Sequence, residues 1–184
     1  ELKTRARELL GTNRALPQVS TFHRFCAALL REEAVAAGLD PEFSILDEDD
    51  STQILQRALD GHAQDKQAAA TKIYYDFSRA LSELPMSQCK PNALPAALLK
   101  PFQPEAVDAL KAYLTELRAS NCIDFSMLLY FSRAILQQDA TVASKWAKRY
   151  RWIQVDEVQD THASEWDVLR ALSIEHKNIA LFGD

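Results

Sequence analysis

The sequence predicts a mostly helical protein that contains a small parallel β-sheet. Apolar residues recur at intervals of three and four along most of the 184 residues, which is the pattern of amphipathic helices. Short β-branched and aromatic runs stand near both ends of the chain, each at a strand-to-helix junction. The composition, 47% hydrophobic and 26% charged, is that of a globular domain with a sizeable core.

The expected elements begin at the first residue. Residues 1–10 carry apolar side chains on one face, and Gly11 is well placed to end that helix. Residues 19–22 form a short strand candidate. Residues 24–37 then have helical spacing, with Gly38 as the stop.

The middle of the chain, residues 46–150, is expected to be helical throughout, with no strand ladder between residues 50 and 150. The observations are helical apolar stripes with N-cap residues before them and proline after them. The clearest signals are the cap candidates Asp47 and Asp124, the stripe Ile73, Phe77, Leu81 and Leu84 before Pro85, and Pro104 in a first turn. Four prolines mark residues 89–104 as the main loop.

The last part of the chain returns to strands. Residues 152–155 read as a short buried strand that stops at two acids, Asp156 and Glu157. A helix follows Thr161, and residues 179–182 form a final strand.

Adjacent carboxylates at the carboxyl end of a strand suggest a specific chemistry. In open α/β sheets ligands bind at that edge, so one carboxylate can hold a magnesium ion and the other can polarise a water. A strand that ends in a solvated acidic turn gives the same pattern. The two acids alone do not decide between a magnesium site and such a turn.

The residues around the pair resemble a known motif. Asp-Glu-Val-Gln-Asp-Thr, from Asp156 to Thr161, resembles motif II of the UvrD/Rep-like superfamily-1 DNA helicases, whose usual form is Asp-Glu-Phe-Gln-Asp-Thr-Asn. Val158 replaces the usual Phe, His162 the usual Asn, and Glu165 the usual Gln.

Four further stretches resemble parts of the same family. Thr-Phe-His with its following Leu-Leu-Arg resembles motif Ib, and Gly183–Asp184 resembles the start of motif III. Phe-Ser-Ile-Leu-Asp (43–47) and Asp-Phe-Ser-Met-Leu-Leu (124–129) resemble the segments that bound and fill the family's helical insertion. By itself, Thr21 would be read as a helix cap and His23 as a packing residue.

The resemblance implies a fold and a function. It implies an incomplete P-loop NTPase (RecA-like) motor domain, residues 1–45 and 151–184, carrying a helical insertion, residues 46–150. It implies an ATP-dependent DNA helicase that uses ATP and Mg²⁺ and acts on single-stranded and duplex DNA. The residues that match family sites are Glu157 (catalytic), Asp156 (metal), Gln159, Asp160, Gly183 and Asp184 (nucleotide sensing and coupling), and Thr21, Phe22 and His23 (DNA).

The sequence lacks other parts of that machinery. None of its glycines precedes a lysine, so no phosphate-binding Gly-Lys-Thr loop is present. We therefore expect a piece of a longer protein, inactive and without tight ATP binding by itself, whose second motor domain lies elsewhere in the same chain. Two alternatives stay open: a non-motor helical interaction module on a degenerate nucleotide-binding half, and the helicase part of a RecB/AddA-type helicase–nuclease.

Charge and cysteine content set further bounds. The net charge of −5 is not that of a typical nucleic-acid binder, although basic residues outnumber acidic ones in residues 1–31. Three widely spaced cysteines argue against a disulfide framework and a zinc site, and favour a reducing, cytoplasmic location. No signal segment and no run of about 20 apolar residues suggests a membrane.

Overall fold

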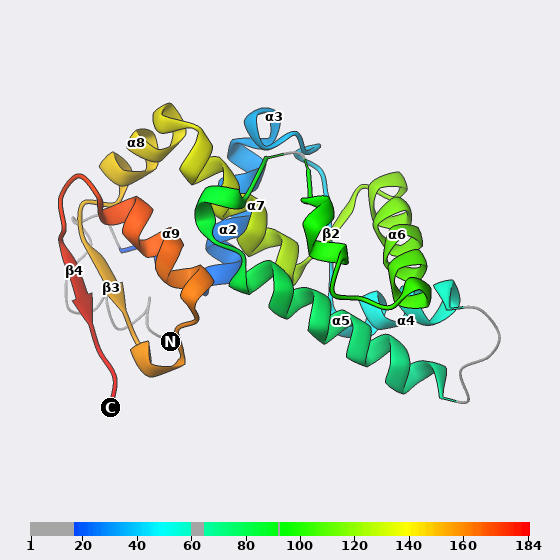
Figure 1. Ribbon diagram of the computed structural model, residues 1–184. Helices are drawn as coiled ribbons and strands as arrows, with labels where there is room; N and C mark the ends of the chain where they lie inside the picture. The colour runs from blue at the N-terminus through cyan, green and yellow to red at the C-terminus, as the bar shows by residue number, and fades with distance from the viewer. Residues whose placement is uncertain (1–16, 60–64, 92) are drawn as a thin grey trace.

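The computed structural model describes residues 17–59, 65–91 and 93–184, so the helix predicted for residues 1–10 lies outside the described residues. The described chain is mostly helical, with two small parallel sheets of two strands each (Figure 1). The predicted fold class, helical with a small parallel β component, is confirmed at that level. No helix in the described ranges is long and apolar enough to cross a bilayer.

The first described elements are two helices rather than a strand and a helix. α2 (Phe22–Glu32) starts at Thr21, which caps it, and α3 (Ala34–Ala37) ends at Gly38 in a left-handed conformation. The prediction of a strand at residues 19–22 is wrong. The segment before Thr21 is extended but pairs with no described strand, and the helix already begins at its last residue.

The middle of the chain holds most of the helices that the apolar stripes predict. The Asp47 side chain accepts the Asp50 N–H at 2.9 Å and begins α4 as expected. Prolines divide the segment that follows α5 into two short 3₁₀ helices. The elements are α4 (Glu48–Ala58), α5 (Lys66–Glu83), η1 (Met86–Gln88), η2 (Ala96–Leu99) and α6 (Pro104–Ala119).

A strand pair inside this region overturns the expectation of a purely helical insertion. β1 (Ser44–Leu46) pairs in parallel with β2 (Cys122–Asp124), which lies between residues 50 and 150. Only three residues long, β2 has no alternation that a pattern could reveal. Asn121, with a φ of 50°, makes the turn that sends the chain from α6 into β2.

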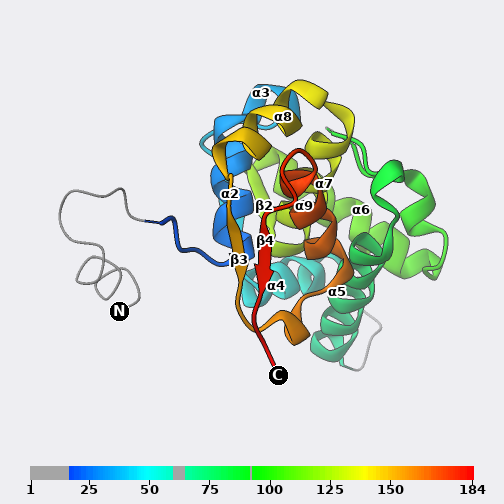
Figure 2. The same cartoon turned by 90° about the vertical axis from the view of Figure 1, so that its left-hand side faces the viewer.

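The last elements agree with the sequence more closely. β3 (Ile153–Val155) pairs in parallel with β4 (Ile179–Leu181), each within the predicted range. Figure 2 shows the two strands side by side with α9 beside them. The helical elements of this part are α7 (Phe125–Gln138), α8 (Ala140–Arg149), η3 (Val158–Asp160) and α9 (Ala163–Ser173).

The core is built around α7. It packs against α2, α5, α8 and α9, and Figure 1 shows it between the β3–β4 sheet at one end and α4 and α6 at the other. Leu128 and Ala134 are fully buried, and Ile135 is 1% exposed. Burying a large aliphatic side chain stabilises the fold by roughly 1.5–3 kcal/mol, and α7 buries three of them: Leu128, Ile135 and Leu136.

A buried carboxylate begins this helix. Asp124 is fully buried, and its oxygens accept the Met127 N–H at 2.8 Å, the Ser126 hydroxyl at 2.7 Å and the Tyr113 hydroxyl at 2.6 Å. Burial, together with the Asp124 charge, raises the pKa of Tyr113 well above its usual value, so its hydroxyl stays a donor. The predicted N-cap at Asp124 is confirmed, and it also ties α6 to α7.

Replacing Asp124 by alanine is expected to lower the free energy of unfolding by about 2–4 kcal/mol, because α7 loses its cap and the buried Tyr113 hydroxyl loses its acceptor. Asp47→Ala is the matched control, since Asp47 caps α4 alone in an exposed position and its loss should cost about 1 kcal/mol. Urea unfolding measures both. Equal losses at the two caps would show that the burial of Asp124 adds nothing to its capping role.

Candidate functional site

The Asp156–Glu157 pair lies at the carboxyl end of β3, in the turn that leads to α9. The pairing with β4 continues past the strand: Phe182 N–H donates to the Val155 carbonyl, and Val158 N–H donates to the Phe182 carbonyl, both at 2.9 Å. Both carboxylates are exposed. The sheet therefore fixes the main chain of the turn while the two acidic side chains remain accessible.

Glu157 has a left-handed backbone conformation, with φ 52° and ψ 47°. This region is uncommon for a residue with a Cβ and costs on the order of 1–3 kcal/mol unless the surroundings impose it. Such strained positions cluster at functional sites. Nothing in the sequence indicates this conformation, because glutamate is not among the residues enriched there.

Three of the residues predicted to act together are in contact. The Gln159 amide donates to the Glu157 carboxylate at 2.7 Å. A Cβ on Gly183 would stand 2.2 Å from the Gln159 side-chain oxygen, so a larger residue there requires the Gln159 side chain to move. Asp160 belongs to the same turn through its N–H, which donates to the Glu157 carbonyl at 3.0 Å, whereas Asp184 makes no such contact in the described structure.

The donor set of this turn fits a magnesium ion that keeps most of its water. Asp156 accepts one hydrogen bond, from the Glu157 N–H at 3.1 Å, and so retains free lone pairs. Among the described residues neither acid has a Lys or Arg within ion-pair distance, and no group of three or more His, Cys, Asp or Glu could enclose a metal. Magnesium binds through one or two carboxylates with water and phosphate completing the shell.

The Thr21–His23 junction has a structural role of its own. The Thr21 hydroxyl accepts the Arg24 N–H at 3.3 Å and caps α2, and the His23 ring meets Phe125 edge to face at 5.1 Å between centroids. Partial burial lowers the pKa of His23, and the Glu165 charge opposes this shift. Phe22, the first residue of α2, is half-buried beside them.

One cavity joins this junction to the carboxylate turn. It has a volume of about 460 Å³ and lies between the 18–23 segment, β3 and α9. Its polar lining includes Thr21, His23, Asp156 and Glu165. Residues from opposite ends of the described chain thus face the same hollow, whereas Glu157, Gln159 and Gly183 lie outside it.

The C-terminal end of α2, at Glu32 and Glu33, is held to α8 by hydrogen bonds from charged and aromatic side chains. Arg149, at the end of α8, donates two hydrogen bonds to Glu32 at 2.6 and 2.7 Å, and the Trp146 indole donates to Glu33 at 2.7 Å. Hydrogen bonds from Arg149 and Lys145 lower the pKa of Glu32 to about 2. α2 is therefore tied to the helix that leads directly into β3.

Glu165 also lines the cavity, although the sequence marks it only as a departure from the motif. It is 8% exposed and accepts the His162 N–H at 2.9 Å, which begins α9. An acid three residues after an N-cap is the capping-box spacing, and that signal could have identified it. Its carboxylate is the charge that acts on His23.

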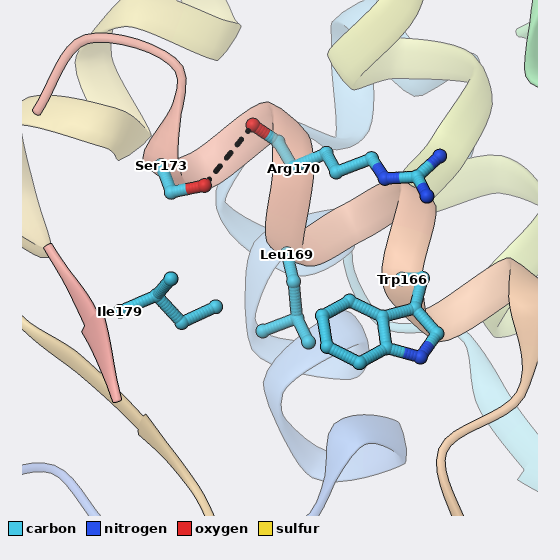
Figure 3. A pocket seen from close by; sticks show the side chains of 5 residues that line it. All are labelled: Trp166, Leu169, Arg170, Ser173 and Ile179. Atoms are coloured by element: carbon cyan, nitrogen blue, oxygen red, sulfur yellow. Dashed lines mark hydrogen bonds between the residues drawn. The ribbon is translucent and has the colours of Figure 1, made fainter. Parts of the chain in front are cut away.

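A second, smaller hollow of about 280 Å³ lies between α9 and β4 (Figure 3). Trp166, Leu169 and Ile179 give it an apolar wall, and Ser173 is turned toward the Arg170 carbonyl, to which it donates at 3.4 Å. None of the residues that the sequence predicts for the site lines this hollow.

Comparison with known families decides the relationship. The family model described as the UvrD/REP helicase N-terminal domain matches residues 1–184. The chain belongs to this family. Membership of one family explains why the motif-like stretches follow one another in this order along the chain.

Named relatives agree with the assignment to the UvrD/REP family. A probable DNA helicase II homolog of Mycoplasma capricolum is 30% identical over the whole chain and 26% of its own length. The ATP-dependent DNA helicase Rep of Escherichia coli is 25% identical over the whole chain and 27% of its length. UvrD1 of Mycobacterium tuberculosis is 31% identical over 94% of the chain and 22% of its length. The chain spans about a quarter of these relatives.

The His23 imidazole of this UvrD/REP-family chain is expected to titrate below its ordinary value of 6.5. Since the folded state binds the proton less readily than the unfolded chain, His23 makes the fold less stable as the pH falls below about 6.5. Glu165→Gln should lower the pKa of His23 further by removing the charge that favours imidazolium. NMR titration measures it, with Glu116→Gln on α6 as a distant control. An upward shift in Glu165→Gln would contradict the assignment.

Proposed function

We propose that the full-length protein is a cytoplasmic ATP-dependent DNA helicase, which hydrolyses Mg-ATP to move along single-stranded DNA and unwind duplex. The observation that supports it best is the cavity that brings the Thr21–His23 junction and Asp156 together at the carboxyl end of β3. A motor must couple its DNA contacts to its nucleotide site, and a cavity lined by both the junction and Asp156 supports such coupling. Membership of the UvrD/REP family and the names of the relatives support the same activity.

The roles of the acidic residues follow from their position. Asp156 would hold the magnesium ion, mostly through water, and the ion would neutralise phosphate charge during phosphoryl transfer. Glu157 would orient and deprotonate the attacking water, for which an exposed carboxylate on a fixed main chain is suited. Two such acids without nearby cations repel a triphosphate, so this chain alone is proposed to be inactive.

The residues next to the acids would detect the nucleotide. Gln159 already donates to Glu157 and lies against Gly183, so a change in the charge held at Glu157 alters both contacts. Asp160 and Asp184 are proposed as part of the same sensing group. In this proposal residues 1–45 and 151–184 belong to a RecA-like motor domain, residues 46–150 form its insertion, and the second motor domain lies in the same full-length protein.

The DNA contact is proposed at the start of α2. A hydroxyl and the N–H groups at a helix N-terminus suit a phosphate oxygen. Thr21 is exposed, so its hydroxyl would donate to a phosphate while it caps α2. Phe22 and His23 would flank the same nucleotide. The DNA would be single-stranded where it meets this junction, with duplex ahead of it.

Glu157→Gln in the full-length protein is expected to reduce DNA-stimulated ATP hydrolysis by about 10²-fold or more, because the amide keeps the shape but cannot accept the proton. ATP binding should survive. Glu116→Gln, an exposed substitution on α6, is the control and should leave turnover unchanged. Steady-state ATPase with single-stranded DNA measures both. Turnover at the parental rate in Glu157→Gln would reject the assignment of this turn.

Thr21→Ala in the full-length protein should weaken binding of single-stranded DNA by roughly 2- to 10-fold, the loss of one hydrogen bond. Because the hydroxyl is neutral, the dependence of affinity on salt should not change, in contrast to removal of a lysine or arginine contact. Thr21→Ser keeps both the hydroxyl and the cap of α2 and is the matched control. Fluorescence anisotropy at two salt concentrations measures affinity, and parental affinity in Thr21→Ala would exclude it from the DNA site.

A further inference from the structure

A charged side chain lies inside the core where α5, α7 and α9 meet. The guanidinium of Arg133, on α7, is 2% exposed. It donates to the Asp167 carboxylate from two nitrogens, at 3.0 and 2.7 Å, and to the Leu81 carbonyl at 3.1 Å. It also donates to the Leu84 carbonyl. Arg133 therefore joins the C-terminal end of α5 to α9.

Stability alone does not account for this group. Removing a guanidinium and a carboxylate from water is costly, and a buried ion pair can often be replaced by apolar residues of similar volume without loss. The pair instead selects a single arrangement of the three helices. The planar guanidinium of arginine is satisfied only when its acceptors on both α5 and α9 are in place. Arg133 thus fixes how α9 sits on α5 and α7.

The helix that it fixes follows the carboxylate turn directly. α9 begins three residues after η3, and a second contact, between the hydroxyls of Ser82 and Ser164 at 3.1 Å, holds its first turn to α5. The turn that contains Glu157 has strained backbone, so its shape depends on what anchors its two sides. β4 anchors the β3 side, and α9 anchors the other.

The N-terminal end of α7 touches the proposed DNA junction. Phe125, its first residue, packs against His23 at 5.1 Å, and the body of α7 lies along α2. α7 therefore connects His23, in the proposed DNA junction, to Arg133, which holds α9. Packed helices and charged networks are routes along which two sites can be coupled, when they have two arrangements that both sites bias.

We propose that Arg133 is a positioning residue that couples the two sites: it transmits DNA occupancy at the Thr21–His23 junction through α7 and α9 to the Asp156–Glu157 turn. The inference rests on the proposed helicase function. Arg133 touches neither ATP nor DNA; it acts through Asp167.

The test compares two ways of removing the arginine in the full-length protein. Arg133→Met leaves Asp167 unpaired and lowers the unfolding midpoint. Arg133→Met with Asp167→Leu replaces the whole pair by apolar groups and should restore that midpoint. In both variants DNA stimulation of ATP hydrolysis should fall by roughly 2- to 30-fold, the range for residues that carry coupling, while the KM for ATP and the rate without DNA stay parental.

Arg57→Met is the matched control, since Arg57 forms an exposed pair with Glu116 between α4 and α6. It should leave DNA stimulation unchanged. If the double variant recovers stimulation together with its midpoint, Arg133 is only structural and the inference is overturned. Should the double variant fold poorly, Asp167→Asn, which keeps the volume and removes the charge, decides by the same readout. If the parental protein shows no DNA-stimulated hydrolysis, the proposed function itself is rejected. That result differs from every outcome that concerns Arg133 alone.

Discussion

The burial of α7 is the constraint on which the rest of the structure depends. The helix is enclosed by α2, α5, α8 and α9, so each of these must present a complementary face to it. The buried charged groups at its start and in its middle each bond to groups outside the helix: Asp124 to Tyr113, and Arg133 to Asp167 and the end of α5. Because a buried charge is costly without its partner, these two contacts select one packing among those that an apolar helix would allow.

The sequence predicted much of the fold because helices of two turns or more have apolar stripes and capping residues that can be read locally. Asp47, Asp124 and Pro104 lie where a helix start requires them, and the structure has helices at each. Strands of three residues have no comparable signal. β1 and β2 are stabilised by each other and by the core, whereas residues 19–22 pair with no strand in the described part of the chain.

The candidate site was predicted in its members but not in its geometry. The resemblance to motifs II and III and the position at the end of a strand predicted Asp156, Glu157, Gln159 and Gly183 as site residues. In the structure Gln159 contacts both Glu157 and Gly183. The left-handed backbone of Glu157 depends on the pairing of Val158 with Phe182, which is a tertiary contact. The Arg133–Asp167 pair joins two helices that each looked ordinary, and no spacing along the chain marks it.

The parallel pairing of β1 with β2 has a consequence for how the chain reaches this structure. Ser44 aligns with Cys122, so α4, α5 and α6 must all be made before the first strand finds its partner. Closing a loop of that length loses chain entropy before any contact compensates it, and such non-local pairings slow folding. During synthesis β1 emerges before β2 and its main-chain groups stay unpaired until then, which leaves this strand open to pairing with another chain.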